Sequence, residues 1–253
     1  MSEQTVQTST SFNIKLQDPT MLKEAVNVIS EMVEEATFSI DQEGIFFKGM
    51  DPSHVCLVDL RSGNQDYEKW EVKQAGNIGL RLDEFSKVLK SLKKKDSLEL
   101  SFNEDQLNIK SSGMSMNLKT IEQSSTDCPL PKLSYNSKIT ITGNELHRIL
   151  KQISNVSNYV TIETYEQRAV FSAKGDNGEV KIEIERGMPE IVEISIREIS
   201  KATYNLEYLM AFVKHLKGHT LTLDYSENMP LRINAHIGHI TQIDYYLAPR
   251  IEN

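Results

Sequence analysis

The sequence predicts an α+β protein made of two similar domains, each with two helices packed on antiparallel sheets. Two observations predict this class. Residues 82–93 and 206–217 align without a gap, with every large apolar position and two lysines matched, and the strands that follow also match. Self-similarity at a fixed offset, here about 124 residues, indicates two structurally alike halves. Four helical patterns among many short alternating strands favour helices on one face of antiparallel sheets.

The first half begins with an alternating strand at 11–16. Asp18 and Pro19 are typical of a helix start, with Asp at the cap and Pro at the first helical position. Apolar residues at 3.6 spacing continue this helix to Val33. The patterns that follow predict strands at 37–40, 44–48, 55–60, 70–73 and 78–82, a helix at 83–93, and strands at 97–102, 106–110 and 114–121.

The second half repeats this order, with helices expected at 144–156 and 205–217. Between the halves, a Ser/Thr run and two prolines cannot continue a ladder or a helix, which indicates an extended linker. The predicted organisation is a disordered tail at 1–11, an N-terminal domain at 12–121, an interdomain connecting linker at 122–134 and a C-terminal domain at 135–253.

The composition is typical of a globular intracellular protein. Of 253 residues, 39% are apolar and 25% charged. No apolar run approaches the roughly 20 residues that span a bilayer, and the N-terminus lacks the basic and apolar regions of a signal peptide. Two cysteines are too few for a disulfide framework, so a reducing compartment is the default. The formal charge of -8 argues against a protein coated in nucleic acid.

Each expected helix turns one stripe of residues away from the core, and on three of the four this stripe is basic. A charged stripe is ordinarily a solvated face, and lysines in a last turn also complement the helix dipole. Recurrence on repeat-related helices of an acidic chain nevertheless favours a surface for duplex phosphates, without sequence reading. The absence of interleaved aromatic residues argues against base stacking. The basic residues are Lys87, Lys90, Lys94, Arg148, Lys151, Lys214 and Lys217, with Lys23 on the weaker first helix.

Three segments are specific enough to indicate a family: GMDPSHV at 49–55, the helix at 82–92, and YYLAPRIE at 245–252. From Phe12 onward, the chain resembles the DNA sliding clamps of the proliferating cell nuclear antigen family, in an archaeal version. The resemblance implies the DNA-clamp fold, with three subunits closed into a pseudo-sixfold ring around duplex DNA. It also implies the function of a DNA polymerase processivity factor, which is a scaffold in replication and repair, not an enzyme, and needs no cofactor.

The resemblance further implies three sets of site residues. The DNA-facing positions are Lys23, Lys87, Lys90, Arg148, Lys151 and Lys214. The groove for a partner peptide is lined by Met50, His54, Val55, Cys128, Leu130, Pro131, Pro230, Ala248, Pro249 and Ile251. Two strand edges, near 114–120 and 178–185, form the subunit interface through Met114, Met116, Leu118, Val180, Ile182 and Ile184.

The partners implied are double-stranded DNA, a clamp loader (replication factor C), and a DNA polymerase, flap endonuclease and DNA ligase that bind through short peptide motifs. No membrane is implied. The expected location is the cytoplasm, at the nucleoid in an archaeon, or the nucleus in a eukaryote. Whether the trimer contains identical chains stays open, and the alternative is one subunit of a heterotrimeric or checkpoint-type clamp scaffold.

The alternative class of protein is an enzyme, and few residues of the sequence favour it. The sequence holds no phosphate-binding loop, dinucleotide-binding glycine motif or nucleophile elbow. His236 and His239 lack a nearby third metal ligand. His54 stands near Asp51 without an activated nucleophile, so a role in the partner groove is favoured. No catalytic and no metal-binding residue is therefore expected.

Overall fold

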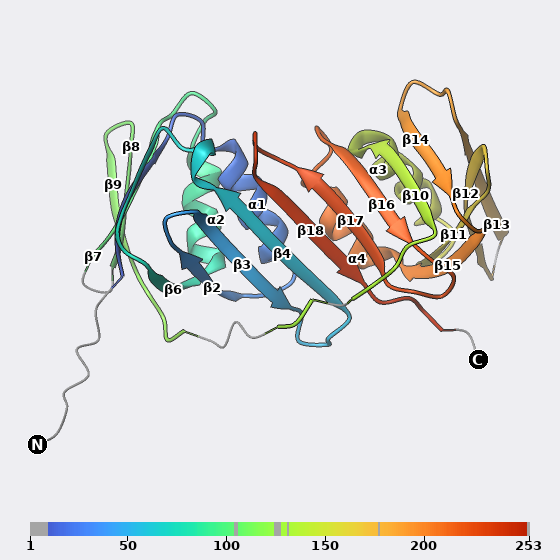
Figure 1. Cartoon of the computed structure of the whole chain (residues 1–253), viewed down its shortest axis with the longest axis horizontal. Coiled ribbons are helices and arrows are strands. Elements are labelled where there is room, and N and C mark those ends of the chain that lie inside the picture. The colour runs from blue at the N-terminus through green and yellow to red at the C-terminus, as the bar shows by residue number, and fades with distance from the viewer. Residues whose placement is uncertain (1–9, 104–105, 124–127, 131, 177, 252–253) are drawn as a thin grey trace, which may run out of the picture. The chain divides into compact units, whose positions relative to one another are not determined.

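The computed structural model divides the chain into two compact units (Figure 1). The residues that it describes are 10–103, 106–123, 128–130, 132–176 and 178–251. The first unit comprises residues 1–48, 60–127 and 238–241, and the second comprises residues 49–59, 128–237 and 242–253. Each unit therefore includes a short segment from the other half of the sequence.

The first unit combines helices α1 and α2 with antiparallel strands. Its elements in chain order are β1 (Ser11–Leu16), α1 (Thr20–Ser30), β2 (Glu35–Ile40), β3 (Gly44–Met50), β4 (Cys56–Gly63), the 3-10 helix η1 (Asn64–Asp66), β5 (Lys69–Gln74), β6 (Gly76–Arg81), α2 (Leu82–Ser91), β7 (Leu98–Asn103), β8 (Gln106–Ser111) and β9 (Met114–Lys119). The strands are ordered β5-β1-β7-β8-β9 and β4-β3-β2-β6. Strand β4 is divided, because its residues 56–59 belong to the second unit.

The second unit combines helices α3 and α4 with further antiparallel strands. Its elements are β10 (Ser137–Thr142), α3 (Gly143–Ile153), β11 (Tyr159–Thr164), β12 (Arg168–Gly175), β13 (Gly178–Glu185), β14 (Ile191–Ile196), β15 (Ser200–Asn205), α4 (Leu206–Val213), β16 (Thr220–Tyr225), β17 (Leu231–His236) and β18 (Gln242–Leu247). The strands are ordered β14-β10-β16-β17-β18-β4 and β13-β12-β11-β15.

The two units repeat one topology, and the predicted α+β class with antiparallel sheets is confirmed. Apart from η1, the order of strand, helix, five strands, helix and three strands occurs twice. Strand order β5-β1-β7-β8-β9 corresponds to β14-β10-β16-β17-β18, and β4-β3-β2-β6 corresponds to β13-β12-β11-β15. One difference matters. Strand β18 has β4 as its next neighbour, whereas its counterpart β9 ends the sheet in the described part of the chain.

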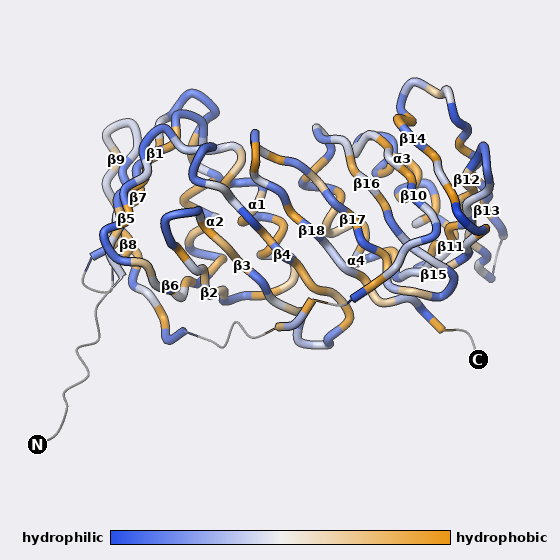
Figure 2. The backbone as a smooth tube through the Cα atoms, in the orientation of Figure 1, coloured by the Kyte–Doolittle hydropathy of each residue, from blue (hydrophilic) through white to orange (hydrophobic). Residues whose placement is uncertain are grey.

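The core of each unit lies between its helices and its strands. Helices α1 and α2 pack against each other on one face of the strands, and so do α3 and α4 (Figure 1). On β17, Leu231 and Ile233 are buried while Arg232 between them is not, and Figure 2 shows this alternation of apolar and polar residues along the strands. Helix α3 buries a stripe at 3.6 spacing that comprises Leu146, Ile149, Leu150 and Ile153.

The helices are shorter than the sequence predicts, and this corrects the basic stripe on α2. That helix ends at Ser91, because Leu92 is extended (φ -79°, ψ 145°) and the Lys93 N–H donates to Asp96 Oδ2 at 2.8 Å. Lys94 therefore lies beyond the helix, so its place at the end of the predicted stripe is wrong. No helix in the described residues is long and apolar enough to cross a membrane.

The start of α1 and the end of α4 are also shifted. Pro19 occupies the N-cap position of α1, and the Asp18 carboxylate accepts a hydrogen bond from the Thr20 N–H at 2.9 Å. The prediction of Asp capping is thus displaced by one residue. Helix α4 ends at Val213, which makes Lys214 its C-cap and leaves Lys217 outside the helix.

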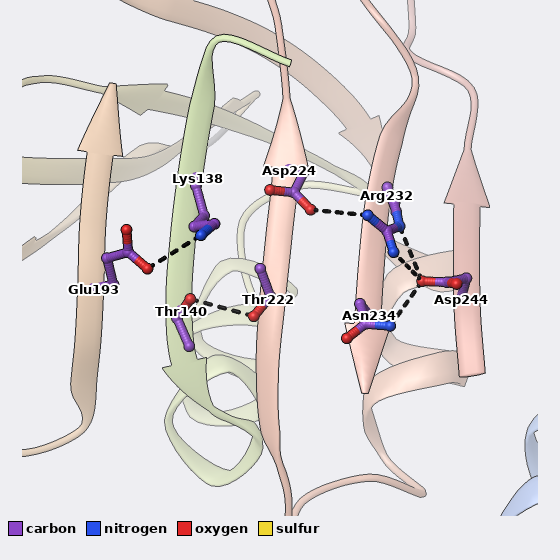
Figure 3. A network of polar contacts seen from close by, with 8 residues as sticks. All are labelled: Lys138, Thr140, Glu193, Thr222, Asp224, Arg232, Asn234 and Asp244. Atoms are coloured by element: carbon purple, nitrogen blue, oxygen red, sulfur yellow. Dashed lines mark hydrogen bonds and ion pairs between the residues drawn. The ribbon is translucent and has the colours of Figure 1, made fainter. Parts of the chain in front are cut away.

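The sheet face of the second unit that points away from the helices carries a polar network (Figure 3). Arg232 on β17 contacts Asp244 on β18 at 2.9 Å and Asp224 on β16 at 3.5 Å. Asn234 donates to the same Asp244 oxygen at 2.8 Å. The Asp224 and Asp244 side chains are only 13% and 5% exposed, so Arg232 balances two desolvated carboxylates. Burial raises the pKa of Asp224 even though Arg232 opposes this effect.

In the first unit, one carboxylate holds the turn between β17 and β18. Asp66 Oδ1 accepts from the His239 N–H at 2.7 Å, and Asp66 Oδ2 accepts from Ile240 at 3.1 Å and Thr241 at 2.6 Å. Burial alone would raise the pKa of Asp66, but these hydrogen bonds, together with one from the Thr241 side chain, outweigh it and hold the pKa below 3.8. The folded state therefore favours the ionised Asp66.

We expect Asp66→Asn to destabilise the protein by about 1–2 kcal/mol at pH 7, because an amide replaces two acceptor oxygens that face N–H groups. Since the folded pKa is lowered, the wild-type contribution is present above pH 3.8 and is lost as the pH falls through the folded value. Urea denaturation at pH 7 and at pH 3 measures both effects. The gap between variant and wild type should narrow at pH 3, and equal stability at pH 7 would contradict this role.

Candidate functional site

The basic residues of the first unit lie on the paired helices α1 and α2. Lys87 and Lys90 are exposed on α2. Lys87 pairs with Asp83 one turn earlier at 3.3 Å, but the two side chains are 77% and 63% exposed, so solvent weakens this ion pair. Lys23 is less available. Its Nζ donates to the backbone carbonyls of Lys90 at 3.3 Å and Leu92 at 3.4 Å, and so caps the end of α2.

In the second unit, α3 and the end of α4 carry the basic residues. Arg148 and Lys151 are exposed on α3, and Lys214 is the exposed C-cap of α4. The Arg148 guanidinium is held by both Glu145 oxygens, at 2.7 and 2.5 Å, and it donates to Gln152 at 3.1 Å. Its hydrogen bonds lower the pKa of Glu145. Arg148 is thus oriented but partly neutralised, whereas no ion pair of Lys151 is found among the described residues.

One residue of this surface was not expected from the sequence. His147 on α3 is half-buried, and burial lowers its pKa, with the charges of Lys217 and Lys151 acting in the same direction. The charges of Lys217 and Lys151 thus both act on His147. A histidine at an outward position of the helical pattern was the available signal, and sequence reasoning passed over it.

The predicted groove residues of the first half lie in segment 50–56, which belongs to the second unit. Asp51 is 4% exposed and organises the segment. Its Oδ1 accepts from the N–H groups of Val55 and Cys56, both at 2.7 Å, and its Oδ2 accepts from the Ser53 N–H at 3.0 Å. Met50 and His54 are left exposed. The sequence identified these neighbours but gave Asp51 itself no role in the groove.

The C-terminal segment reaches segment 50–56 directly. The Ala248 N–H donates to the Val55 carbonyl at 2.9 Å. Two residues on, the Arg250 N–H donates to the Thr203 carbonyl at 2.7 Å, and its guanidinium lies 4.1 Å from the centre of the Tyr159 ring. These anchors on either side of Pro249 leave Ile251 73% exposed. An apolar side chain is therefore presented to solvent from a fixed backbone.

The structure describes most, but not all, of the remaining predicted groove residues. Pro230 and Pro249 are half-buried, as are Cys128 and Leu130 of the linker. The carbonyl of Met229, which precedes Pro230, accepts from the Tyr204 hydroxyl at 2.8 Å, which fixes that turn. Pro131 lies outside the described residues. The geometry thus joins Val55 and Ala248 by a hydrogen bond and leaves the linker contribution a prediction.

The two predicted interface strands lie at sheet edges in the described residues. Strand β9 ends the order β5-β1-β7-β8-β9, and β13 ends the order β13-β12-β11-β15. Met116 is 40% exposed, and Met114, Val180 and Ile182 are half-buried. Leu118 and Ile184 are 4% and 1% exposed, so they already pack within their own units. These edges therefore offer unpaired backbone N–H and C=O groups and a few apolar side chains for contact with a second chain.

The groups that could suggest catalysis have structural surroundings. Asp51 directs its carboxylate to backbone N–H groups and not to the His54 side chain. Burial and the charge of Asp51 raise the pKa of the Cys56 thiol to about 12, so it is not a reactive thiolate. In the ranges that the structure describes, no group of three or more His, Cys, Asp and Glu residues could hold a metal ion.

Family models and relatives match nearly the whole chain. The model of the proliferating cell nuclear antigen N-terminal domain matches residues 11–129, and that of the C-terminal domain matches residues 129–250. A DNA polymerase sliding clamp of Nitrosopumilus maritimus is 43% identical over 248 residues, which are 96% of this chain and 100% of the relative. The sliding clamp of Cenarchaeum symbiosum is 37% identical over 247 residues, with the same coverage.

Solved structures share the fold at lower identity. The clamp of Thermococcus kodakaraensis has a TM-score of 0.91 at 23% identity and covers 94% of this chain and 100% of its own. A structure of the C-terminal region of FEN-1 bound to the proliferating cell nuclear antigen of A. fulgidus has a TM-score of 0.89 at 23% identity and covers 96% of this chain and 99% of its own. The two-domain clamp fold expected from the sequence is thereby confirmed.

Proposed function

Because this chain belongs to the proliferating cell nuclear antigen family of DNA sliding clamps, we propose that it is a DNA polymerase processivity factor that encircles duplex DNA as a trimeric ring. It acts as a tether and catalyses no reaction. We further propose the domain boundaries predicted from the sequence, with an N-terminal domain at 12–121, a connecting linker at 122–134 and a C-terminal domain at 135–253. It works in the cytoplasm at the nucleoid, which the archaeal relatives support.

The ring is supported by a difference in strand pairing between the two repeats. Inside the chain, β18 is followed by β4. The counterparts of these two strands are β9 and β13, and both are sheet edges in the described residues. Placing β13 of a second copy beside β9 would repeat the pairing that the chain already makes once. Cyclic assembly is a recognised way to cover such edges, and it involves Met114, Met116, Leu118, Val180, Ile182 and Ile184.

The helices α1 to α4 would then face the duplex. The lysine and arginine side chains of these helices would contact the charged phosphates of the DNA backbone. Such contacts carry no sequence information. The proposed contacts are Lys23, Lys87, Lys90, Arg148, Lys151 and Lys214. Encirclement prevents escape, so these screened contacts need only centre the ring and let it slide.

Partners would bind in the groove around segment 50–56 and the C-terminal segment. Exposed Met50 and Ile251 offer adaptable apolar contacts, and the fixed backbone near Ala248 can add a peptide strand. The bound FEN-1 C-terminal region in the A. fulgidus structure supports a short peptide as the ligand. The partners proposed are a clamp loader, a DNA polymerase, a flap endonuclease and a DNA ligase.

Retention on closed circular DNA tests the function directly. The protein is loaded onto a nicked plasmid with replication factor C and ATP, and the DNA fraction is isolated by gel filtration. We expect the protein to stay on the circle, to be lost after a single cut, and to be retained again when bulky proteins block the cut ends. Equal retention on circular and open linear DNA would contradict encirclement. Native mass near three times 28.8 kDa checks the trimer.

A further inference from the structure

Segment 51–56 adopts an unusual backbone conformation. His54 has a φ of 57°, in the left-handed region that side chains other than glycine seldom adopt. Such a conformation persists only when the surrounding structure holds it. Here the Asp51 carboxylate accepts three backbone N–H bonds within the segment, and the backbone of Asp51 bonds with His54 and Cys56. One buried carboxylate therefore fixes the turn.

This carboxylate has a fourth donor from outside the segment. The Tyr208 hydroxyl of α4 donates to Asp51 Oδ2 at 3.1 Å. The Tyr208 carbonyl accepts from the Tyr245 hydroxyl of β18 at 3.2 Å, and Tyr245 also hydrogen-bonds the Cys56 thiol. The segment is thus tied to one helix and one strand of the same unit. Burial tends to raise the pKa of Asp51, but its hydrogen-bond donors outweigh this effect and lower it, so the carboxylate is ionised and accepts all four bonds.

We propose that Asp51 and Tyr208 are positioning residues of the partner groove, which hold segment 51–56 in the shape that receives a peptide. They set peptide affinity without touching the peptide. This inference rests on the proposed function, because it presupposes that Met50, His54 and Val55 line the groove. A groove whose backbone is fixed before binding avoids the ordering cost that weakens binding to a mobile loop.

The two substitutions remove different parts of this arrangement. Tyr208→Phe deletes one hydroxyl and leaves the three N–H bonds to Asp51. Asp51→Asn places an amide among donors that need an anion. We expect roughly threefold weaker binding for Tyr208→Phe and at least about tenfold weaker binding for Asp51→Asn, measured by calorimetric titration with a peptide of the FEN-1 C-terminal region. Hydrogen exchange at 53–56 should be faster in both free variants and should slow again with saturating peptide.

Two matched controls separate positioning from general stability. Tyr165→Phe removes another hydroxyl-to-carboxylate bond of the second unit, the 2.7 Å contact with Glu163. Asp66→Asn removes another carboxylate that accepts several backbone N–H bonds, in the first unit. Both controls should bind the peptide as the wild type does. Trimer mass and melting temperature are recorded for every variant, and Tyr208→Phe decides the matter if Asp51→Asn does not fold.

The outcomes distinguish this inference from the proposed function. Weaker binding and faster exchange in the two variants alone support positioning. Wild-type affinity in both Asp51→Asn and Tyr208→Phe overturns positioning while the groove stands. Equal losses in the controls also overturn it, because they indicate a general effect of stability. A wild-type protein that binds no such peptide, yet stays on circular DNA, overturns the groove and this inference without affecting encirclement.

Discussion

Replacing Lys87, Lys90, Arg148 and Lys151 with Glu should abolish clamp-dependent processive synthesis while leaving the trimer intact. All four side chains are exposed on α2 and α3, so the change removes no core contact. Four reversals take the formal charge of -8 to about -16 per chain, which turns attraction for the phosphates into repulsion. We expect at least about a tenfold loss of long products in primer extension, with strong dependence on salt.

The matched control reverses four lysines outside the helices, namely Lys69, Lys73, Lys110 and Lys174. This variant has the same net charge as the first, so any effect of overall charge on solubility or loading is shared. Native mass confirms the trimer in both. If the control loses synthesis equally, or if the helix variant keeps it, then α2 and α3 do not face the duplex.

Arg232→Met should be among the most destabilising single substitutions in the second unit. The change leaves Asp224 and Asp244 without their cation, in a network that Figure 3 shows on one sheet face. Removing one partner of a buried ion pair costs about 3–5 kcal/mol. Because the Arg232 side chain is 32% exposed, we expect a loss near the lower end, about 3 kcal/mol, in urea denaturation at pH 7.

A pH series and a second variant test the cause of that loss. Burial raises the pKa of Asp224, so the deficit should shrink as the pH falls toward that raised value, since a protonated Asp224 carboxyl needs no cation. Lys138→Met breaks the ion pair between Lys138 and Glu193, whose two side chains are 43% and 42% exposed. This substitution should lower the free energy of unfolding by less than about 1 kcal/mol. Similar losses for both variants, or a deficit in Arg232→Met that does not depend on pH, would show that packing and not charge explains the effect.

The topology could be predicted because apolar periodicity is local and occurs twice. The matched patterns at 82–93 and 206–217 correctly implied two equivalent helices. Their ends could not be predicted so well, because the lysine-rich segment after Ser91 favours a helix by propensity. The turn that replaces it depends on the Asp96 carboxylate. This carboxylate accepts a hydrogen bond from the Lys93 N–H and a second one, at 3.1 Å, from the hydroxyl of Ser112, which belongs to a later hairpin. Helix ends are decided by such tertiary contacts.

The sequence names candidate site residues one by one, and these stay predictions, but it does not identify the groups that hold them in place. The bond from Tyr208 to Asp51 joins positions 157 residues apart, and that from His239 to Asp66 joins positions 173 apart. No spacing rule links such residues. Likewise, Lys23 was expected to face DNA, but only the fold reveals that its ammonium group caps α2. Sequence patterns predict which side chains are presented, whereas the supports beneath them depend on the folded chain.

The two unmatched edges also determine how an assembly of this chain can end. Strands β9 and β13 are different surfaces, so a contact between them is head-to-tail, and each added copy presents a new free edge. Growth stops only when the last edge meets the first. A small change in the angle at this contact would therefore leave the strand pairing intact and convert a closed ring into an open helical filament. The angle at one strand pair, more than its strength, decides whether the protein can enclose anything.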